Sequence, residues 1–303
     1  MINLLNSARK IIRARVDKQI RKGTQPQILL RSKINNSIVF CIVHWNAPDY
    51  LLLTVAQIEL LYPACKIYIL DNGSQQVHLA SIVTGLKKFN NVTLFASFGC
   101  PKWAKKFYLD TLFEWQSHTA GLQFLLNYSA KQSDEIAVFL DQDCIISTHI
   151  DRFFLKFSKD IILIGARDRW RGHACSNLIH PSFMILQPKR IHQLFGSSSF
   201  YDERTQLLED YARDPYHGLS FKALGRMLYL EVRMHGKIPL LTSYVYDKTV
   251  YAWHAWYSSR LVGITSAIVD GYPVSWLQEV RKTEYDFMVE IHKKTQAELK
   301  NLE

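Results

Sequence analysis

The sequence has no long apolar run and no pair of closely spaced cysteines. None of its apolar stretches approaches the ~18 residues that span a bilayer, and the first 30 residues lack the apolar core of a secretory signal peptide. An odd, scattered set of cysteines favours reduced thiols over a disulfide framework: Cys41, Cys65, Cys100, Cys144 and Cys175. We therefore expect a cytoplasmic protein in which Cys41 and Cys144 are small buried apolar residues.

Acidic residues are scarce at the N-terminus. Residues 1–33 hold one acid, Asp17, against nine lysines and arginines, and so carry +8 of the formal net charge of +10. Apolar residues recur in this basic arm at helical spacing: Leu4, Leu5, Ala8, Ile12, Val16 and Ile20. This pattern predicts a helix on an anionic membrane surface, with the protein peripheral on the inner face of the cell membrane. A solvated arm that aids solubility or caps the domain is the alternative. Because the rest of the chain is nearly neutral, no nucleic-acid partner is expected.

The rest of the chain alternates between apolar runs typical of buried strands and helical patterns. The first run, Ser37 to His44, is continuously apolar, as expected of a strand that is buried on both faces. A helix is predicted from Pro48 to Leu61, and further strands at Lys66 to Leu70, Val92 to Ala96 and Ile136 to Leu140. Such alternation predicts βαβ units, and hence an α/β fold with a mostly parallel, Rossmann-like sheet flanked by helices in a single large domain.

Polar residues follow these predicted strands directly. Asn46 follows the first strand, Asp71 the second, and Asp141 and Asp143 the fourth. Ligands of parallel sheets bind beyond the carboxyl ends of the strands, so these side chains are expected to meet at one crevice. Local alternatives remain for two of them, since Asp71 fits an Asx-turn and Asn46 fits a helix cap before Pro48.

The two carboxylates after the fourth strand predict a cation site. If the chain stays extended through Asp141-Gln142-Asp143, both aspartates face the same side. Two like charges at the edge of a low-dielectric core are unfavourable unless a cation lies between or beside them. Oxygen ligands suit Mg²⁺ or Mn²⁺, which in turn hold a diphosphate. An ordinary acidic turn is the alternative, because Asp-x-Asp is common in loops.

The series IVFCIVHWNAPDYL, KIYILDNGS and VFLDQD resembles the nucleotide-binding half of family 2 glycosyltransferases with the GT-A fold, and the resemblance covers roughly residues 37–260. It implies transfer of a sugar from a nucleoside diphosphate sugar. On this resemblance, His44 to Asn46 line the nucleoside and Asp71 contacts its base or ribose. Asp141 contacts the ribose or the metal, and Asp143 is a direct metal ligand.

The resemblance extends to a candidate base and a candidate histidine ligand. Glu209-Asp210 resembles the family's Glu-Asp element, whose aspartate is the general base in inverting members, so Asp210 is expected to deprotonate the acceptor hydroxyl, with Asp214 as the second candidate. The chain departs from the pattern here, since the matching glycine, Gly236, comes late, and a plain surface carboxylate is the alternative. His254 has the relative position of a late histidine that completes the metal or diphosphate site, although a packed, hydrogen-bonded histidine is equally compatible.

Three segments follow from these patterns. We expect the basic arm to span residues 1–33 and a helical tail to span 276–303. The resemblance implies a glycosyltransferase domain at 34–275, with a nucleotide-binding half at 34–145 and an acceptor-binding half at 146–275. The LDQD motif also resembles that of bacterial rhamnosyltransferases of cell-surface polysaccharide assembly, which implies a deoxythymidine diphosphate sugar donor and a glycan or lipid-linked acceptor.

Two other classes of function share some of these features. A nucleotidyltransferase has a similar sheet but normally carries a glycine-rich, basic loop after its first strand, and residues 44–48 contain neither glycine nor lysine. A non-enzymatic nucleic-acid binder would use the basic arm on phosphates, but the strand-end carboxylates would then have no role. Retaining glycosyltransferases share the sheet and the Asp-x-Asp motif, so a retaining mechanism is the alternative to the expected inversion.

Overall fold

One large sheet organises the protein in a computed structural model, which describes residues 26–96, 110–167, 178–198, 200, 218–235, 241–255, 268–269 and 272–301. Within these ranges eleven strands are joined in the order β1-β4-β3-β2-β5-β8-β7-β9-β10-β11-β6. The strands are β1 (Gln27–Leu30), β2 (Ile38–His44), β3 (Lys66–Asp71), β4 (Val92–Ala96), β5 (Ile136–Asp141), β6 (Cys144–Ile146), β7 (Leu163–Arg167), β8 (Ile179–Leu186), β9 (Met227–His235), β10 (Leu241–Tyr246) and β11 (Thr249–Ala255), with a separate pair, β12 (Ile268–Val269) and β13 (Tyr272–Pro273). The helical elements are α2 (Pro48–Leu61), α3 (Gln76–Leu86), α5 (Asp110–Gln132), α6 (Asp151–Phe154), α7 (Pro188–Phe195), η1 (Gly196–Ser198), α8 (Gly218–Lys222) and α9 (Val274–Lys300).

The core of the sheet is parallel. Strands β4, β3, β2 and β5 pair in parallel register, with Val43 opposite both Leu70 and Asp141. Every residue of β2 after Ile38 is buried, which explains why the run is apolar. The predicted α/β fold with a large sheet flanked by helices is therefore confirmed, and the strands predicted from the sequence match β2 to β5 closely.

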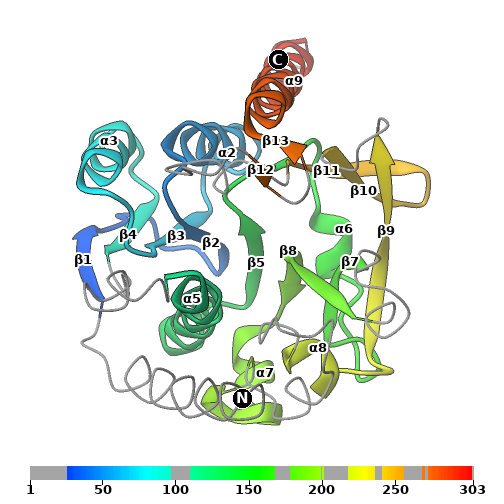
Figure 1. The fold of residues 1–303 in the computed structure, drawn as a ribbon. Helices are drawn as coiled ribbons and strands as arrows, with labels where there is room; N and C mark the ends of the chain where they lie inside the picture. Colours follow the sequence, from blue (N-terminus) through cyan, green and yellow to red (C-terminus); the bar gives the residue numbers. More distant parts are fainter. Residues whose placement is uncertain are drawn as a thin grey trace, which may run out of the picture.

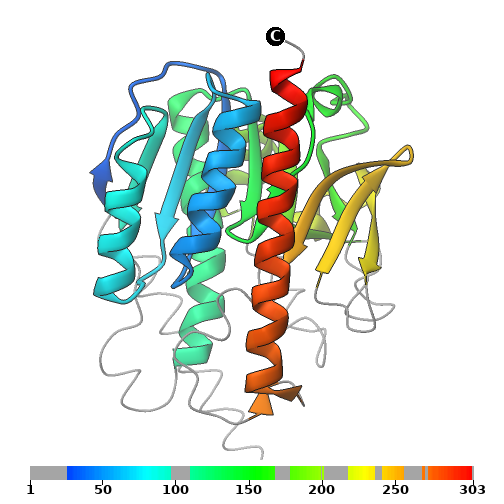
Figure 2. The same cartoon turned by 90° about the horizontal axis from the view of Figure 1, so that it is seen from above.

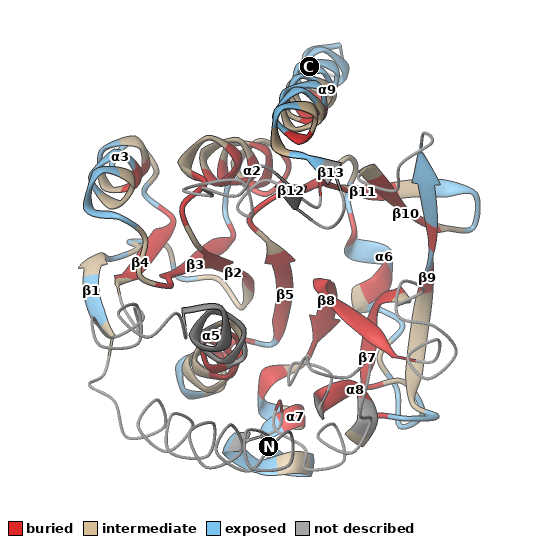
Figure 3. Cartoon of the chain, viewed as in Figure 1, coloured by how far each residue is buried: buried red, intermediate tan, exposed pale blue. Residues whose placement is uncertain are grey.

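Helices cover both faces of this parallel core (Figure 1). On one face, α2 and α3 pack through Leu51, Val55 and Ile82 against apolar side chains of β2 and β3. On the other face, α5 and α7 pack through Leu125 and Ile191. The strands at the centre are buried, whereas exposed residues lie on the outer helices and on strands β1 and β9 (Figure 3).

Antiparallel pairing extends the sheet at both edges. Strand β1 pairs with β4, so the sheet begins inside the segment that the sequence assigned to the basic arm, of which residues 1–25 lie outside the described ranges. On the other side, β8 pairs antiparallel with both β5 and β7, β9 then pairs with β7 in parallel, and β10 and β11 follow in antiparallel pairs. Strand β6 comes two residues after β5 yet pairs with β11. This pairing brings β11 beside the carboxyl end of β5.

The C-terminal helix α9 lies along α2 and against β11 (Figure 2). Its buried positions are Leu277, Glu284, Met288 and Thr295, which share one face of the helix. The Arg281 guanidinium is paired with the Asp49 carboxylate of α2 at 2.8 Å, and the Tyr50 hydroxyl donates to the Arg281 carbonyl. Among the helices that the structure describes, none is both long and apolar enough to cross a membrane.

Candidate metal and nucleotide site

Strand pairing brings a histidine that is distant in the sequence beside two neighbouring aspartates. Asp141 ends β5, Asp143 lies in the turn that follows, and His254 comes from β11, where it is the register partner of Cys144. The Ala255 N–H donates to the Asp143 carbonyl at 3.0 Å, which fixes the turn against β11. The condition that the chain stays extended through Asp143 is not met, because residues 142 and 143 form a turn. The two carboxylates nevertheless face the same site.

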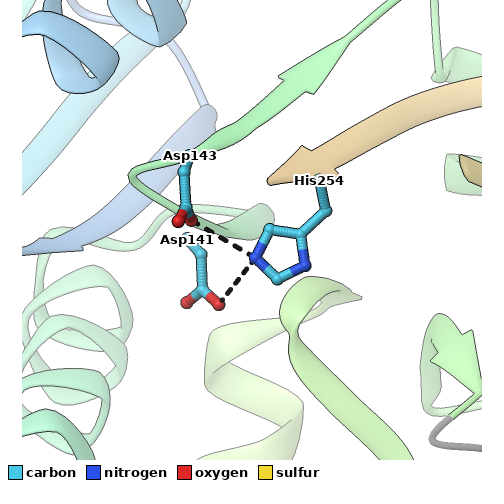
Figure 4. Close-up of side chains that lie close together, drawn as sticks. All are labelled: Asp141, Asp143 and His254. Carbon is cyan, nitrogen blue, oxygen red and sulfur yellow. Dashed lines mark ion pairs between the residues drawn. The ribbon is translucent and has the colours of Figure 1, made fainter. Parts of the chain in front are cut away.

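The three side chains form a tight cluster (Figure 4). The His254 Nε2 atom lies 3.2 Å from Asp143 Oδ1 and 3.5 Å from Asp141 Oδ2. One ligand atom from each residue lies within 4.8 Å of the others, which is a suitable arrangement for a metal ion. The side chains of His254 and Asp143 are buried, whereas that of Asp141 is 20% exposed and leaves one side of the cluster open.

A chain of buried hydrogen bonds holds the other nitrogen of His254. Its Nδ1 lies 2.9 Å from the Tyr244 hydroxyl, which lies 2.6 Å from Ser182 Oγ, which lies 2.8 Å from Nδ1 of His180. The Ser182 N–H also donates to that His180 nitrogen, which is therefore an acceptor. One direction satisfies every link: Ser182 donates to His180, Tyr244 to Ser182, and His254 Nδ1–H to Tyr244. This leaves Nε2 of His254 directed at the two carboxylates.

The electrostatics at Nε2 favour a positive charge there. Burial alone lowers the pKa of His254, but the Asp143 and Asp141 carboxylates raise it more, so its pKa lies above the ordinary value. An unprotonated Nε2 would aim its lone pair at two carboxylates, and either a proton or a bound cation removes that repulsion. Imidazole and carboxylate ligands suit Mn²⁺, and a metal at this position displaces the proton.

His118 of α5 also faces the cluster, and the sequence did not single it out. Its Nε2 lies 3.8 Å from Asp141 Oδ1. Burial lowers the pKa of His118, and the neighbouring Asp141 and Asp143 carboxylates only partly oppose this shift. A neutral imidazole is therefore favoured beside Asp141. His118 lies in a helix that packs against β2 and β5, and no pattern in the sequence identifies it as part of the site.

The residues expected to bind the nucleoside form one hydrogen-bonded group between the loops after β2 and β3. The His44 Nε2 accepts from the Ala47 N–H at 3.2 Å, so its Nδ1–H donates to Asp71 Oδ1 at 3.1 Å. The Ser74 N–H donates to Asp71 Oδ2 at 3.1 Å, as the Asx-turn alternative predicts. Asn46 is not the cap of α2, because its Oδ1 accepts from the Gln75 N–H at 2.8 Å and Ala47 occupies the N-cap position.

This group sets the shape of both loops. His44, Asn46 and Asp71 are all buried, and Asn46 adopts a left-handed backbone conformation, with φ of 54°. Such a conformation is uncommon for a residue other than glycine and marks a sharply defined loop. The structure therefore brings these three predicted residues together, and their contact with a nucleoside stays a prediction.

Gln142 links the metal cluster to the loop after β2. Its Oε1 accepts from the Trp45 N–H at 2.7 Å and its Nε2 donates to the Trp45 carbonyl at 3.1 Å. The Thr54 hydroxyl of α2 donates to the Gln142 carbonyl at 2.9 Å. The residue between the two aspartates thus joins the turn to the neighbouring loop, a role that the sequence did not predict.

Glu284 of α9 is a further acidic residue near the cluster. It is 4% exposed, and burial, together with the Asp143 carboxylate, raises its pKa to about 8, against the opposing effect of His254 and Arg281. A sequence signal exists for it, because Glu284 occupies the same helical face as Leu277 and Met288, where an apolar residue is expected. The candidate bases Asp210 and Asp214 lie outside the described residues.

No protein-family model matches the chain, and no curated protein matches its sequence. Solved structures with distant similarity include the galactosyltransferase LgtC in complex with donor and acceptor sugar analogues (TM-score 0.42, 14% identity, covering 63% of this chain and 73% of that chain). They also include the glycosyltransferase GlyE of Streptococcus pneumoniae (0.42, 12%, 66% and 45%) and the mannosyltransferase PcManGT of Pyrobaculum calidifontis in complex with GDP-Man and Mn²⁺ (0.40, 10%, 75% and 64%). Similarity at this level does not establish an activity.

Proposed function

We propose that this protein is a metal-dependent glycosyltransferase that moves a sugar from a nucleoside diphosphate sugar to a hydroxyl group of a glycan or lipid-linked acceptor. The observation that carries the proposal is the cluster of Asp141, Asp143 and His254 at the carboxyl end of β5. It lies at the edge where the parallel strands β2, β3 and β5 all end, which is where α/β sheets bind nucleotides.

The donor set of the cluster fits Mn²⁺ or Mg²⁺. Asp143 and His254 would hold the cation from the buried side, and Asp141 from the more exposed side. When bound, the cation offsets the negative charge that develops on the departing diphosphate. The pKa of His254, raised by the two carboxylates, supports the fit, since it reflects an environment that favours positive charge at Nε2.

The remaining steps are assigned to residues of this chain. The hydrogen-bonded group of His44, Asn46 and Asp71 at the ends of β2 and β3 is proposed to receive the nucleoside, because the loop after β2 adjoins the cluster through the Gln142–Trp45 pair. Asp210 is proposed as the base that accepts the proton of the acceptor hydroxyl, with Asp214 as the alternative. A direct displacement of this kind inverts the configuration at the anomeric carbon.

The test is the release of nucleoside diphosphate from a panel of nucleotide sugars in the presence and absence of Mn²⁺. We expect Mn²⁺-dependent turnover of one donor, and a loss of at least ~100-fold in Asp143→Asn, since that change removes charge from the ligand group. Asp160→Asn is the matched control, because Asp160 is exposed and distant in sequence from the cluster. Turnover that survives in Asp143→Asn, or that needs no divalent cation, would contradict the proposal.

Stereochemistry and the base are tested on the same reaction. The proton NMR spectrum of the first product formed distinguishes inversion from retention. Asp210→Asn is expected to abolish transfer while donor binding persists, whereas Asp214→Asn is expected to reduce it only modestly. The opposite ranking would assign the base to Asp214.

A further inference from the structure

Glu284 is a buried carboxyl group to which no described residue forms a hydrogen bond. Both of its carboxylate oxygens are inaccessible and lack a hydrogen-bond partner within the described ranges, and the residue is 4% exposed. A polar group in this position costs free energy because it has lost its water without gaining a partner. An apolar residue at the same place on α9 would avoid this cost.

The packing of α9 directs Glu284 toward the metal cluster. One turn further along the helix, Met288 packs with Ile145 and Ala255, which lie two residues after Asp143 and one residue after His254. One turn earlier, the Arg281 carbonyl accepts a hydrogen bond from the Tyr50 hydroxyl. Glu284 is therefore held between one contact that packs α9 against the residues beside the cluster and one that ties α9 to α2. It interacts electrostatically with both Asp143 and His254.

Glu284 does not belong to the inner group of ligands. The ligand atoms that lie within 4.8 Å of one another come from Asp141, Asp143 and His254. Mg²⁺ and Mn²⁺ in protein sites usually retain some of their water molecules, and carboxylates in the outer shell accept hydrogen bonds from such waters. A buried carboxylate that interacts electrostatically with Asp143 and His254 and whose two oxygens have no hydrogen-bond partner within the described ranges suits this role.

We propose that Glu284 is an outer-shell carboxylate of the metal site, which accepts a hydrogen bond from water bound to the cation and thereby makes α9 part of the site. This inference rests on the proposed function, because it requires the cation held by Asp141, Asp143 and His254. Glu284 acts through water and is a positioning residue. Its unpartnered oxygens find their partner only when the cation and its water are bound.

The test is direct measurement of Mn²⁺ binding to the full chain without nucleotide, by the loss of the electron paramagnetic resonance signal of free Mn²⁺. We expect Glu284→Gln, which keeps the volume and removes the charge, to weaken Mn²⁺ binding by ~10-fold or more, as outer-shell changes do. Glu284→Asp, which keeps the charge on a shorter side chain, is expected to give an intermediate loss. Glu290→Gln is the matched control, since Glu290 is exposed on the same helix.

The outcomes separate this inference from the proposed function. Binding that depends on Asp143 but is unchanged in Glu284→Gln would overturn the role of Glu284 and leave the proposed function intact. If the unsubstituted protein shows no Mn²⁺ binding that depends on Asp143, both the role of Glu284 and the proposed function are overturned. Melting temperatures in the presence of a chelator show whether each variant is folded, and Glu284→Asp serves as the readout if Glu284→Gln is unfolded.

Discussion

His254 uses its two ring nitrogens for different tasks. Nε2 faces the carboxylates of Asp141 and Asp143, whereas Nδ1 is held by the Tyr244 hydroxyl. A histidine that binds a metal normally donates its other N–H to such a partner, which fixes the tautomer and the ring orientation. The buried chain through Ser182 to His180 therefore selects the tautomer that leaves Nε2 available to a cation.

Removing the Tyr244 hydroxyl tests this role. Tyr244→Phe keeps the ring that packs against Phe183 but takes away the acceptor for His254 Nδ1–H. We expect Mn²⁺ affinity to fall by ~10-fold, in the range typical of outer-shell changes, measured by titration calorimetry. Tyr246→Phe is the control, because Tyr246 lies on the same strand and packs against Phe153 instead. Equal affinity in both variants would show that the hydrogen bond does not orient His254.

The residues of the site differ in how far the sequence predicts them. Asp141 and Asp143 could be identified because they follow a buried apolar run, and His254 because of its relative position in the resemblance. The partners of His254 could not be identified, since the link from Ser182 to Tyr244 spans 62 residues and arises from the register of separate strands. No local pattern encodes such a contact.

Among the elements, the parallel strands were predictable and the antiparallel extension was not. Strands β2, β3 and β5 are buried on both faces and read as continuous apolar runs. Strand β6 has only three residues, and its pairing with β11 depends on a turn at Gln142 that no glycine or proline of the sequence marks. This pairing places His254 in the site.

Glu284 of helix α9 makes the free energy of unfolding depend on pH. Its pKa is raised from 4.5 to about 8, so the folded state binds a proton that the unfolded state releases between these values. In the absence of metal, the contribution of Glu284 to the free energy of unfolding is therefore greatest below about pH 4.5. This contribution is lost as the pH rises toward 8. At about 1.4 kcal/mol per pKa unit, the free energy of unfolding falls by several kcal/mol at most.

We expect Glu284→Gln to remove this pH dependence. In urea unfolding with a chelator present, the variant should gain stability relative to the natural sequence as the pH rises from 5 to 8, and Glu290→Gln should not. A difference between Glu284→Gln and the natural sequence that stays constant over this range would show that Glu284 is ionised in the folded protein.

At the scale of the whole molecule, a single sheet connects the proposed nucleotide and metal sites. The parallel half supplies the loops after β2 and β3, and the antiparallel half supplies β11 and His254. Gln142 and the turn around it join the two halves. The α/β class was predictable from the alternation of apolar runs, whereas the docking of α9 beside the site was not, because the sequence assigned this segment only as a helical tail.

The most direct test of the central claim is a thermal-shift panel of uridine, guanosine, deoxythymidine and cytidine diphosphates, each with and without Mn²⁺. A ligand at ~100 times its dissociation constant stabilises the folded state by about 2.7 kcal/mol, which raises the melting temperature by several degrees. We predict a shift that requires Mn²⁺, that occurs with one nucleotide in preference to the others, and that disappears in Asp143→Asn. No shift with any nucleotide in the presence of Mn²⁺ would contradict the account and make residues 141–143 an ordinary acidic turn.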